Sequence, residues 1–211
     1  VVLLHGDLSG GGTADGMAAR AASVAAAAPS VLAVALARPG YGFGDGSAST
    51  GSANGRRDHY TAANIDAVAD AIRRLKAAHR PARTVVAGHS GGAATAGVIA
   101  GRHPDIADAY VLLSCPCDVA AWRSGRGSRG WKNSLSPSDF AAGVPPAVRV
   151  VAVTGADDDN APGDLARAYV DSLRRRGVDA TYRDAPGAGH GLGDSYWNSG
   201  ALDAVLRAVK G

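Results

Sequence analysis

This chain of 211 residues has few cysteines, no long apolar run and no strong excess of either charge. Its two cysteines have no histidine nearby in the sequence to complete a zinc site. No apolar stretch approaches the ~20 residues that a membrane-spanning helix needs, and no signal peptide with a charged start is visible. We therefore expect no metal ion, no cofactor and no membrane span, and the localisation stays open with the cytoplasm favoured.

The charge balance argues against a nucleic-acid partner. The chain has 22 basic and 19 acidic residues, and its isoelectric point is near 9.1. Most of the basic residues are arginines spread over predicted helices and one loop, whereas a nucleic-acid-binding surface gathers them in one patch. With 46% hydrophobic residues the chain can bury one sizeable core. We expect a single domain over residues 1–211 and a small-molecule partner, with the oligomeric state undecided.

The two cysteines, Cys115 and Cys117, flank Pro116 at the end of an apolar run. Side chains at positions i and i+2 of an extended chain point to opposite faces, so a disulfide between them is not expected. We interpret both as small buried hydrophobic residues at a strand end.

Apolar runs alternate with helical spacings along the chain. We expect strands near residues 1–5, 31–36, 84–88, 109–114, 148–154 and 179–184. We expect helices over residues 14–28, 61–79, 91–102, 163–176 and 199–210. This alternation predicts an α/β protein with a mostly parallel sheet of about six strands and helices on both faces.

The pentapeptide Gly88-His89-Ser90-Gly91-Gly92 lies between a predicted strand and a predicted helix. Glycines two residues before and two residues after a serine allow the sharp turn of a nucleophile elbow, because side chains at these positions would clash. The alternative is that Ser90 merely caps the helix that follows.

A loop with acids and a loop with a histidine follow this serine. Residues 156–162 contain three consecutive aspartates, and residues 186–191 carry His190 between glycines. Serine, acid, histidine is the chain order of the α/β-hydrolase triad. With the His5-Gly6 pair and the Arg-Pro-Gly-Tyr-Gly segment at 38–42, these motifs make the chain resemble the α/β-hydrolase superfamily, in particular its esterase and prolyl-oligopeptidase-like branches.

The resemblance implies an α/β-hydrolase fold with a small or absent cap. Family members usually have two further strands before the His-Gly strand, so we expect N-terminal strands to be missing from this sequence. Residues 117–147 fall where the family inserts a cap, and they are expected to form either a small lid or a plain solvated loop. The arginines of this segment either receive an anionic substrate or are simply solvated, and solvation is favoured.

The resemblance also implies roles for single residues. Ser90 would be the nucleophile, and His190 would accept its proton. Family loops read Gly, two residues, Asp, three residues, Pro, so Gly155 and Pro162 select Asp158 as the acid.

Two flanking acids, Asp157 and Asp159, would lie on the surface, and Asp118 is a less favoured substitute for the acid. The oxyanion hole would combine the backbone N–H of Gly91 with that of Asp7 as first choice or Leu8 as second.

Three functions follow as hypotheses. The first is a serine hydrolase that cleaves a carboxylic ester of a small substrate through an acyl-enzyme on Ser90, with short acyl groups preferred. The second is a peptidase or amidase of the prolyl-oligopeptidase type. The third is a ligand-binding protein on the same fold that has no catalytic activity.

Overall fold

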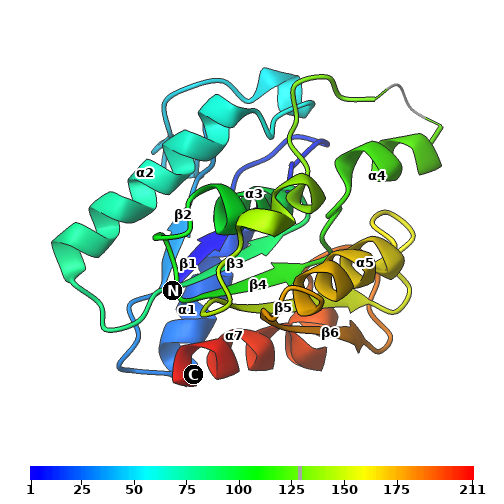
Figure 1. Cartoon of the computed structure of the whole chain (residues 1–211). Coiled ribbons are helices and arrows are strands. Elements are labelled where there is room, and N and C mark those ends of the chain that lie inside the picture. The colour runs from blue at the N-terminus through cyan, green and yellow to red at the C-terminus, as the bar shows by residue number, and fades with distance from the viewer. Residues whose placement is uncertain (128–129) are drawn as a thin grey trace.

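The computed structural model describes residues 1–127 and 130–211, and a six-stranded parallel sheet runs through its centre (Figure 1). The strands lie in the order β2-β1-β3-β4-β5-β6. Their bounds are β1 Val2–Leu4, β2 Val34–Leu36, β3 Val85–His89, β4 Ala109–Leu113, β5 Arg149–Gly155 and β6 Asp179–Ala185. The predicted α/β class and strand number are confirmed.

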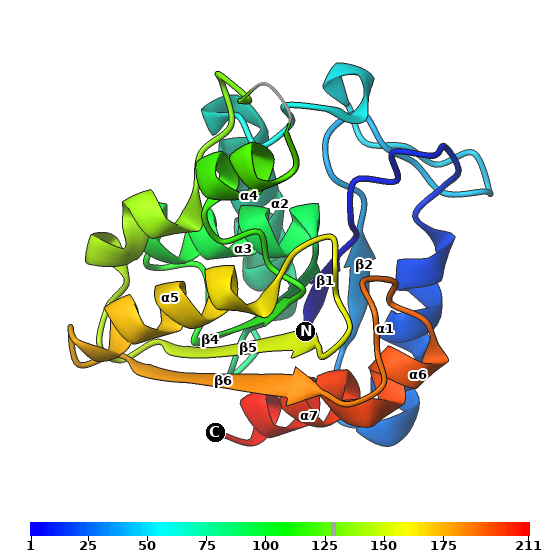
Figure 2. The same cartoon turned by 90° about the vertical axis from the view of Figure 1, so that its right-hand side faces the viewer.

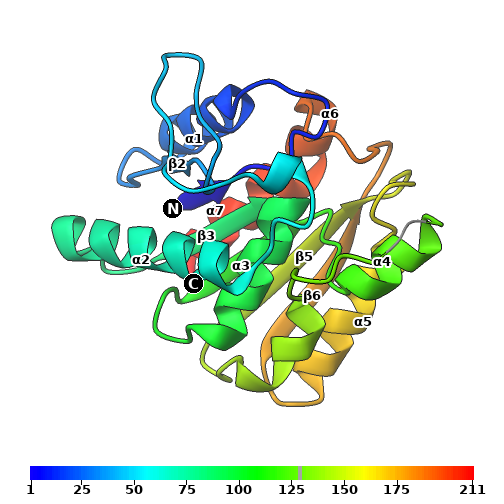
Figure 3. The ribbon, with the colours of Figure 1, turned by 90° about the horizontal axis from the view of Figure 1, so that it is seen from above.

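Helices cover both faces of the sheet (Figure 2). On one face lie α2 (Ala62–His79), α3 (Gly91–Arg102) and α5 (Gly163–Arg174), and on the other lie α1 (Asp15–Ala27) and α7 (Leu202–Lys210). Seen from above, α2, α3 and α5 succeed one another across the sheet from its β2 side to its β6 side (Figure 3). Neighbouring strand residues therefore enter different cores: Val85 packs with α1 and α7, and Val86 with α2 and α3.

The helices begin and end close to where sequence signals place them. At the start of α2 the hydroxyl of Thr61 accepts a hydrogen bond from the Asn64 N–H, which satisfies one free donor of the first turn. The C-terminal helical region starts earlier than the predicted residue 199. A short α6 (Asp194–Tyr196) and a π-helical turn η3 (Trp197–Ala201) precede α7, because Tyr196 and Trp197 are buried in the same core as α1.

The predicted lid region, residues 117–147, contains two helical pieces. They are α4 (Val119–Gly125) and the 3₁₀ segment η2 (Pro137–Gly143), which packs on α3. Residues 128 and 129 of this region lie outside the described residues. A further 3₁₀ turn, η1 (Asn54–Arg56), interrupts the polar loop that precedes α2.

The prediction that Cys115 and Cys117 would not bridge is wrong, because the structure contains a disulfide between them. The chain is not extended here. The Cys117 N–H donates to the Cys115 carbonyl in a three-residue turn, which brings the two Cα atoms to 5.0 Å. The prediction that both residues are buried is confirmed.

Parallel strands bring their carboxyl ends to one edge of the sheet. Residues 5–8 follow β1 and Ser90 follows β3, and these two strands are neighbours at the point where the strand order reverses. Such a switch point is where open α/β sheets bind ligands. The loops after β5 and β6 reach the same edge and carry Asp158 and His190. Among the helices of the described residues, none is long and apolar enough to cross a membrane.

Candidate active site

Ser90 occupies the sharp turn between β3 and α3. Its φ of 54° and ψ of −117° lie outside the regions that non-glycine residues prefer, so the backbone here is strained. The turn depends on glycine: a Cβ at Gly88 would overlap the Gly92 carbonyl, and a Cβ at Gly92 would overlap the Leu4 carbonyl. Ser90 is 7% exposed, so the turn presents its hydroxyl at the floor of a pocket.

A chain of hydrogen bonds joins Ser90, His190 and Asp158. The Nε2 atom of His190 lies 3.0 Å from Ser90 Oγ, and its Nδ1 lies 3.0 Å from both carboxylate oxygens of Asp158. Because a carboxylate only accepts, Nδ1 carries the proton and Nε2 presents its lone pair to the serine hydroxyl. This tautomer is the one that can take a proton from Ser90.

Asp158 is set apart from its neighbours by burial. It is 7% exposed, and its Oδ1 also accepts from the N–H groups of Asn160 and Ala161. Burial raises the pKa of the Asp158 carboxyl, but hydrogen bonds from His190 and the Ala161 N–H outweigh it, so that pKa lies below its ordinary value of 3.8. Asp158 is therefore ionised at neutral pH.

The other acids considered from the sequence lie elsewhere. Asp157 and Asp159 are exposed on the same loop. Asp118 caps α4, where its carboxylate accepts from the Ala121 N–H.

The loop after β1 is anchored at several points. The guanidinium of buried Arg38 donates to the Gly6 carbonyl at 2.7 Å and to the Asp7 carboxylate at 2.8 Å. Tyr60 donates to the other oxygen of that carboxylate at 2.6 Å, and Tyr41 donates to the Asp7 carbonyl at 2.8 Å. The carboxylate lies against Gly91, where a Cβ would overlap it. Arg38 thus compensates the negative charge of this carboxylate next to Gly91.

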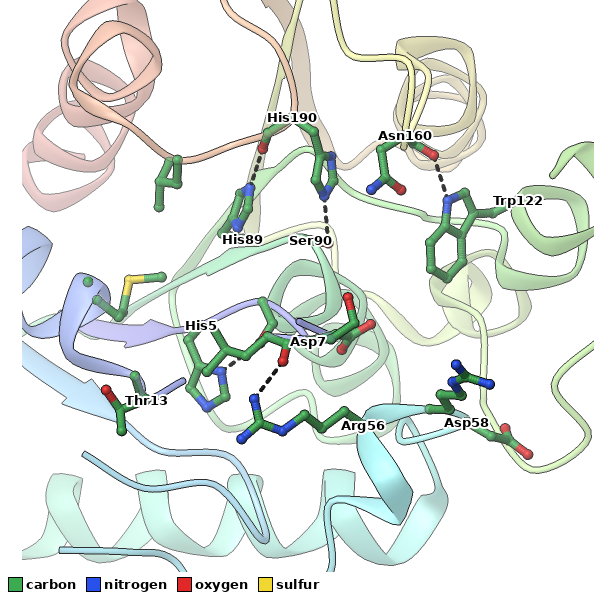
Figure 4. Close-up of a pocket in the computed structure, with 18 of the residues that line it drawn as sticks. His5, Asp7, Thr13, Arg56, Asp58, His89, Ser90, Trp122, Asn160 and His190 are labelled. Carbon is green, nitrogen blue, oxygen red and sulfur yellow. Dashed lines mark hydrogen bonds between the residues drawn. The ribbon is translucent and has the colours of Figure 1, made fainter. Parts of the chain in front are cut away.

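A pocket of about 1100 Å³ opens over Ser90 and His190 (Figure 4). In this view the serine and histidine lie between His89 on one side and Trp122 on the other, with Asp7 and Arg56 on a further wall. The predicted lid region contributes Trp122, Arg123 and Trp131 to the lining. Whether this region moves as a lid stays a prediction.

The prolyl oligopeptidase family matches residues 23–205 of the chain. The chain belongs to this family. No curated protein matches the sequence.

Solved structures give this prolyl oligopeptidase family member the α/β-hydrolase fold. Esterase PE8 superposes with a TM-score of 0.68 at 17% identity, over 98% of this chain and 91% of that one. Est1E from Butyrivibrio proteoclasticus, solved with ferulic acid bound, gives a TM-score of 0.70 at 16% identity, over 100% and 89%. Puromycin hydrolase gives 0.61 at 20% identity, and there 77% of this chain covers only 28% of the longer protein.

Several residues that shape the site of this family member carried no role in the sequence interpretation. Arg38 begins the Arg-Pro-Gly-Tyr-Gly segment of the resemblance and follows β2 at the same edge as the catalytic candidates, but no contact was predicted for it. Tyr60 precedes α2 and gave no signal, since its contact with Asp7 spans 53 residues of chain. His5 and His89 flank the motifs of the site, and both make hydrogen bonds to backbone groups near it.

Proposed function

We propose that this protein is a serine hydrolase that cleaves a carboxylic ester of a small substrate through an acyl-enzyme on Ser90. The observation that carries the proposal is the hydrogen-bonded series Ser90, His190, Asp158 at the floor of an open pocket. Membership of a hydrolase family supports it.

The first half of the reaction forms the acyl-enzyme. His190 Nε2 takes the proton from Ser90 Oγ as that oxygen bonds to the ester carbonyl carbon. Asp158 holds the Nδ1–H and stabilises the positive charge that develops on the ring. The Nε2 proton then passes to the departing alcohol oxygen as its bond to carbon breaks.

The second half repeats this exchange with water. His190 takes a proton from a water molecule that attacks the acyl carbon, and it returns that proton to Ser90 as the acid leaves. The whole cycle consumes one water molecule and releases an alcohol and a carboxylic acid. Ser90 and His190 return to their starting protonation states.

In both halves the carbonyl oxygen becomes an anion that needs donors. We assign the backbone N–H of Gly91 and that of Asp7 or Leu8 to this role. Gly91 is the first residue of α3, where the N–H groups have no partner within the helix and the helix dipole favours negative charge. The Arg38 and Tyr60 contacts hold the first loop in position and offset the charge of the Asp7 side chain.

A peptidase or amidase is the second candidate, and family membership favours it. The two differ in leaving group, since an amine needs fuller protonation by His190 than an alcohol does. A ligand-binding protein without activity is disfavoured, because such a protein needs neither a strained serine nor a histidine of the matching tautomer.

A fluorophosphonate probe tests the proposal directly. Labelling of the wild type, with the adduct located on Ser90 by mass spectrometry, and hydrolysis of p-nitrophenyl butyrate are the expected results. Ser90→Ala should abolish both while circular dichroism stays unchanged. An adduct elsewhere, or equal ester hydrolysis by Ser90→Ala, would reject the assignment, and aminoacyl amides cleaved faster than esters would favour the peptidase.

A further inference from the structure

One wall of the pocket is built from Trp122 and Arg123 of α4 and Trp131 of the following segment; we call these three residues the Trp-Arg wall. The Trp122 indole N–H donates to the Asn160 carbonyl at 2.7 Å, which ties α4 to the loop of Asp158. The two indoles meet edge to face with centroids 5.4 Å apart, and Tyr60 packs edge to face on Trp131 at 5.3 Å. The Asn160 carbonyl and the Tyr60 ring therefore fix the positions of the two indoles without a ligand.

The Arg123 guanidinium lies close to both indoles of this wall, whose planes are 85° apart. Its central carbon lies 4.8 Å from the Trp131 ring and 5.2 Å from the Trp122 ring. Within residues 1–127 and 130–211 no carboxylate pairs with Arg123, and its buried Nε has no hydrogen-bond partner. The aromatic rings hold the cation without engaging its N–H donors, and its two terminal nitrogens form no hydrogen bond within the described residues, which leaves them for two-point binding of a carboxylate.

Other arginines on the pocket already use their donors. Arg56 donates from its two terminal nitrogens to the carbonyls of Leu8 and Gly12. Arg20 pairs with Asp194 at 2.7 Å. Arg126 donates to the backbone and side-chain oxygens of Asn160. Arg57 is exposed and lies over no aromatic ring of the described residues. Among the arginines of this pocket in the described residues, Arg123 alone combines contact with aromatic rings and donors without a hydrogen-bond partner.

The acids of the pocket do not compete for Arg123. Asp7 binds Arg38 and Tyr60, and Asp194 binds Arg20. Asp58 accepts from the backbone N–H groups of residues 132–134. Asp7 and Asp194 are paired with cations and Asp58 is bound by backbone N–H groups, so none of the three carboxylates occupies Arg123.

We propose that the substrate of this site carries a carboxylate, which Arg123 binds while the apolar part of the same group packs against Trp122 and Trp131. This inference rests on the proposed hydrolase function and names the class of its substrate. The carboxylate belongs either to a short acyl group or to the leaving group, and the experiment separates these two sources.

Two matched pairs of esters test the proposal. For the acyl side, p-nitrophenyl hemisuccinate is compared with p-nitrophenyl butyrate, which has the same number of carbons and no charge. For the leaving-group side, 4-butyryloxybenzoate is compared with the neutral 4-butyryloxybenzamide. We expect kcat/KM to favour the anionic member of one pair by about tenfold or more, as a charge-assisted hydrogen bond allows. The pair that responds identifies the side.

Three variants assign the preference to Arg123. Arg123→Gln should remove the preference for the anion, and Arg123→Lys should restore part of it. Arg167→Gln is the matched control, since Arg167 also lies close to an aromatic ring, 4.1 Å above Tyr182, but lies outside the pocket lining. It should leave the ratio unchanged. A preference for the neutral ester in both pairs, or an unchanged ratio in Arg123→Gln, would overturn the proposal.

A binding measurement separates this proposal from the proposed function. Calorimetry on the Ser90→Ala variant with succinamate and with 4-hydroxybenzoate reports binding without turnover. Loss of binding of one of these anions on adding Arg123→Gln supports the anion site even if no ester is hydrolysed. No binding of either anion by Ser90→Ala, in a protein whose wild type hydrolyses p-nitrophenyl butyrate, would reject the anion site and leave the hydrolase assignment standing.

Discussion

The ring of His89 donates a hydrogen bond from Nε2 to the backbone carbonyl of His190, across 2.7 Å. The two imidazole centroids are 5.2 Å apart, so the residue before the serine braces the loop that carries the histidine. Burial, and then the neighbouring His190, lowers the pKa of His89 to about 4. His89 therefore stays neutral at working pH and braces the loop without adding a charge beside His190.

Replacing His89 by phenylalanine should lower kcat about tenfold with little change in KM, because a loosened His190 loop weakens proton transfer more than binding. His89→Gln, which keeps an N–H donor at a similar reach, should recover part of the loss. Steady-state kinetics on p-nitrophenyl butyrate measure both. Equal rates in His89→Phe and the wild type would show that the loop needs no such brace.

Asp158→Asn should reduce kcat by about 10³ to 10⁴-fold, because an amide can hold the ring in the wrong tautomer and does not stabilise imidazolium. Asp157→Asn and Asp159→Asn, on the exposed part of the same loop, should change it less than about twofold. Initial rates on one ester suffice for the comparison. A large loss of kcat in Asp157→Asn would identify Asp157, in place of Asp158, as the acid that supports His190.

How far the sequence predicts the site depends on how far apart its residues are in the chain. The spacing of Gly155 and Pro162 picked out Asp158, and the structure puts that carboxylate on His190. The six strands and five of the main helices followed from apolar periodicity, whereas the order of the strands in the sheet did not. Arg38 and Tyr60 could not be placed with Asp7, because contacts across 31 and 53 residues depend on how the loops fold back over the sheet edge. The Cys115–Cys117 disulfide was missed because the turn at Pro116 replaced the extended chain assumed there.

Asp7→Ala should lower the free energy of unfolding by about 3 to 5 kcal/mol, because it leaves the buried Arg38 guanidinium without its carboxylate. Asp194→Ala is the matched control: it breaks an ion pair of the same pocket, but its carboxylate is 85% exposed, so the cost should stay below about 1 kcal/mol. Urea unfolding gives both values. Similar losses in the two variants would mean that the Arg38 charge is compensated in another way.

The stability of the fold should fall as the pH drops from 6.5 towards 4. His5 is held neutral by geometry, since its Nδ1 donates to the Gly6 carbonyl and its Nε2 accepts from the Arg38 N–H. Burial, and then the Arg38 charge, lowers the pKa of His5 from 6.5 to about 3, and burial lowers that of His89 to about 4. Below pH 6.5 the unfolded chain binds protons at these two residues and the folded chain does not. The contribution of the two neutral histidines to the free energy of unfolding is therefore full above pH 6.5 and falls as the pH drops.

Each of these histidines should contribute a slope of up to about 1.4 kcal/mol per pH unit to the free energy of unfolding in this interval. Asp158 adds nothing to the slope in this interval. Because the pKa of its carboxyl is lowered in the folded protein, it reduces the free energy of unfolding only as the pH falls below 3.8. Urea unfolding at pH 7.5, 6.5, 5.5 and 4.5 measures the slope. His5→Gln should flatten the slope even if the variant is less stable at every pH. His79→Gln, at an exposed position of α2, is the control for the loss of an imidazole and should leave the slope unchanged. A slope that is the same in His5→Gln and the wild type would show that His5 does not resist protonation in the folded protein.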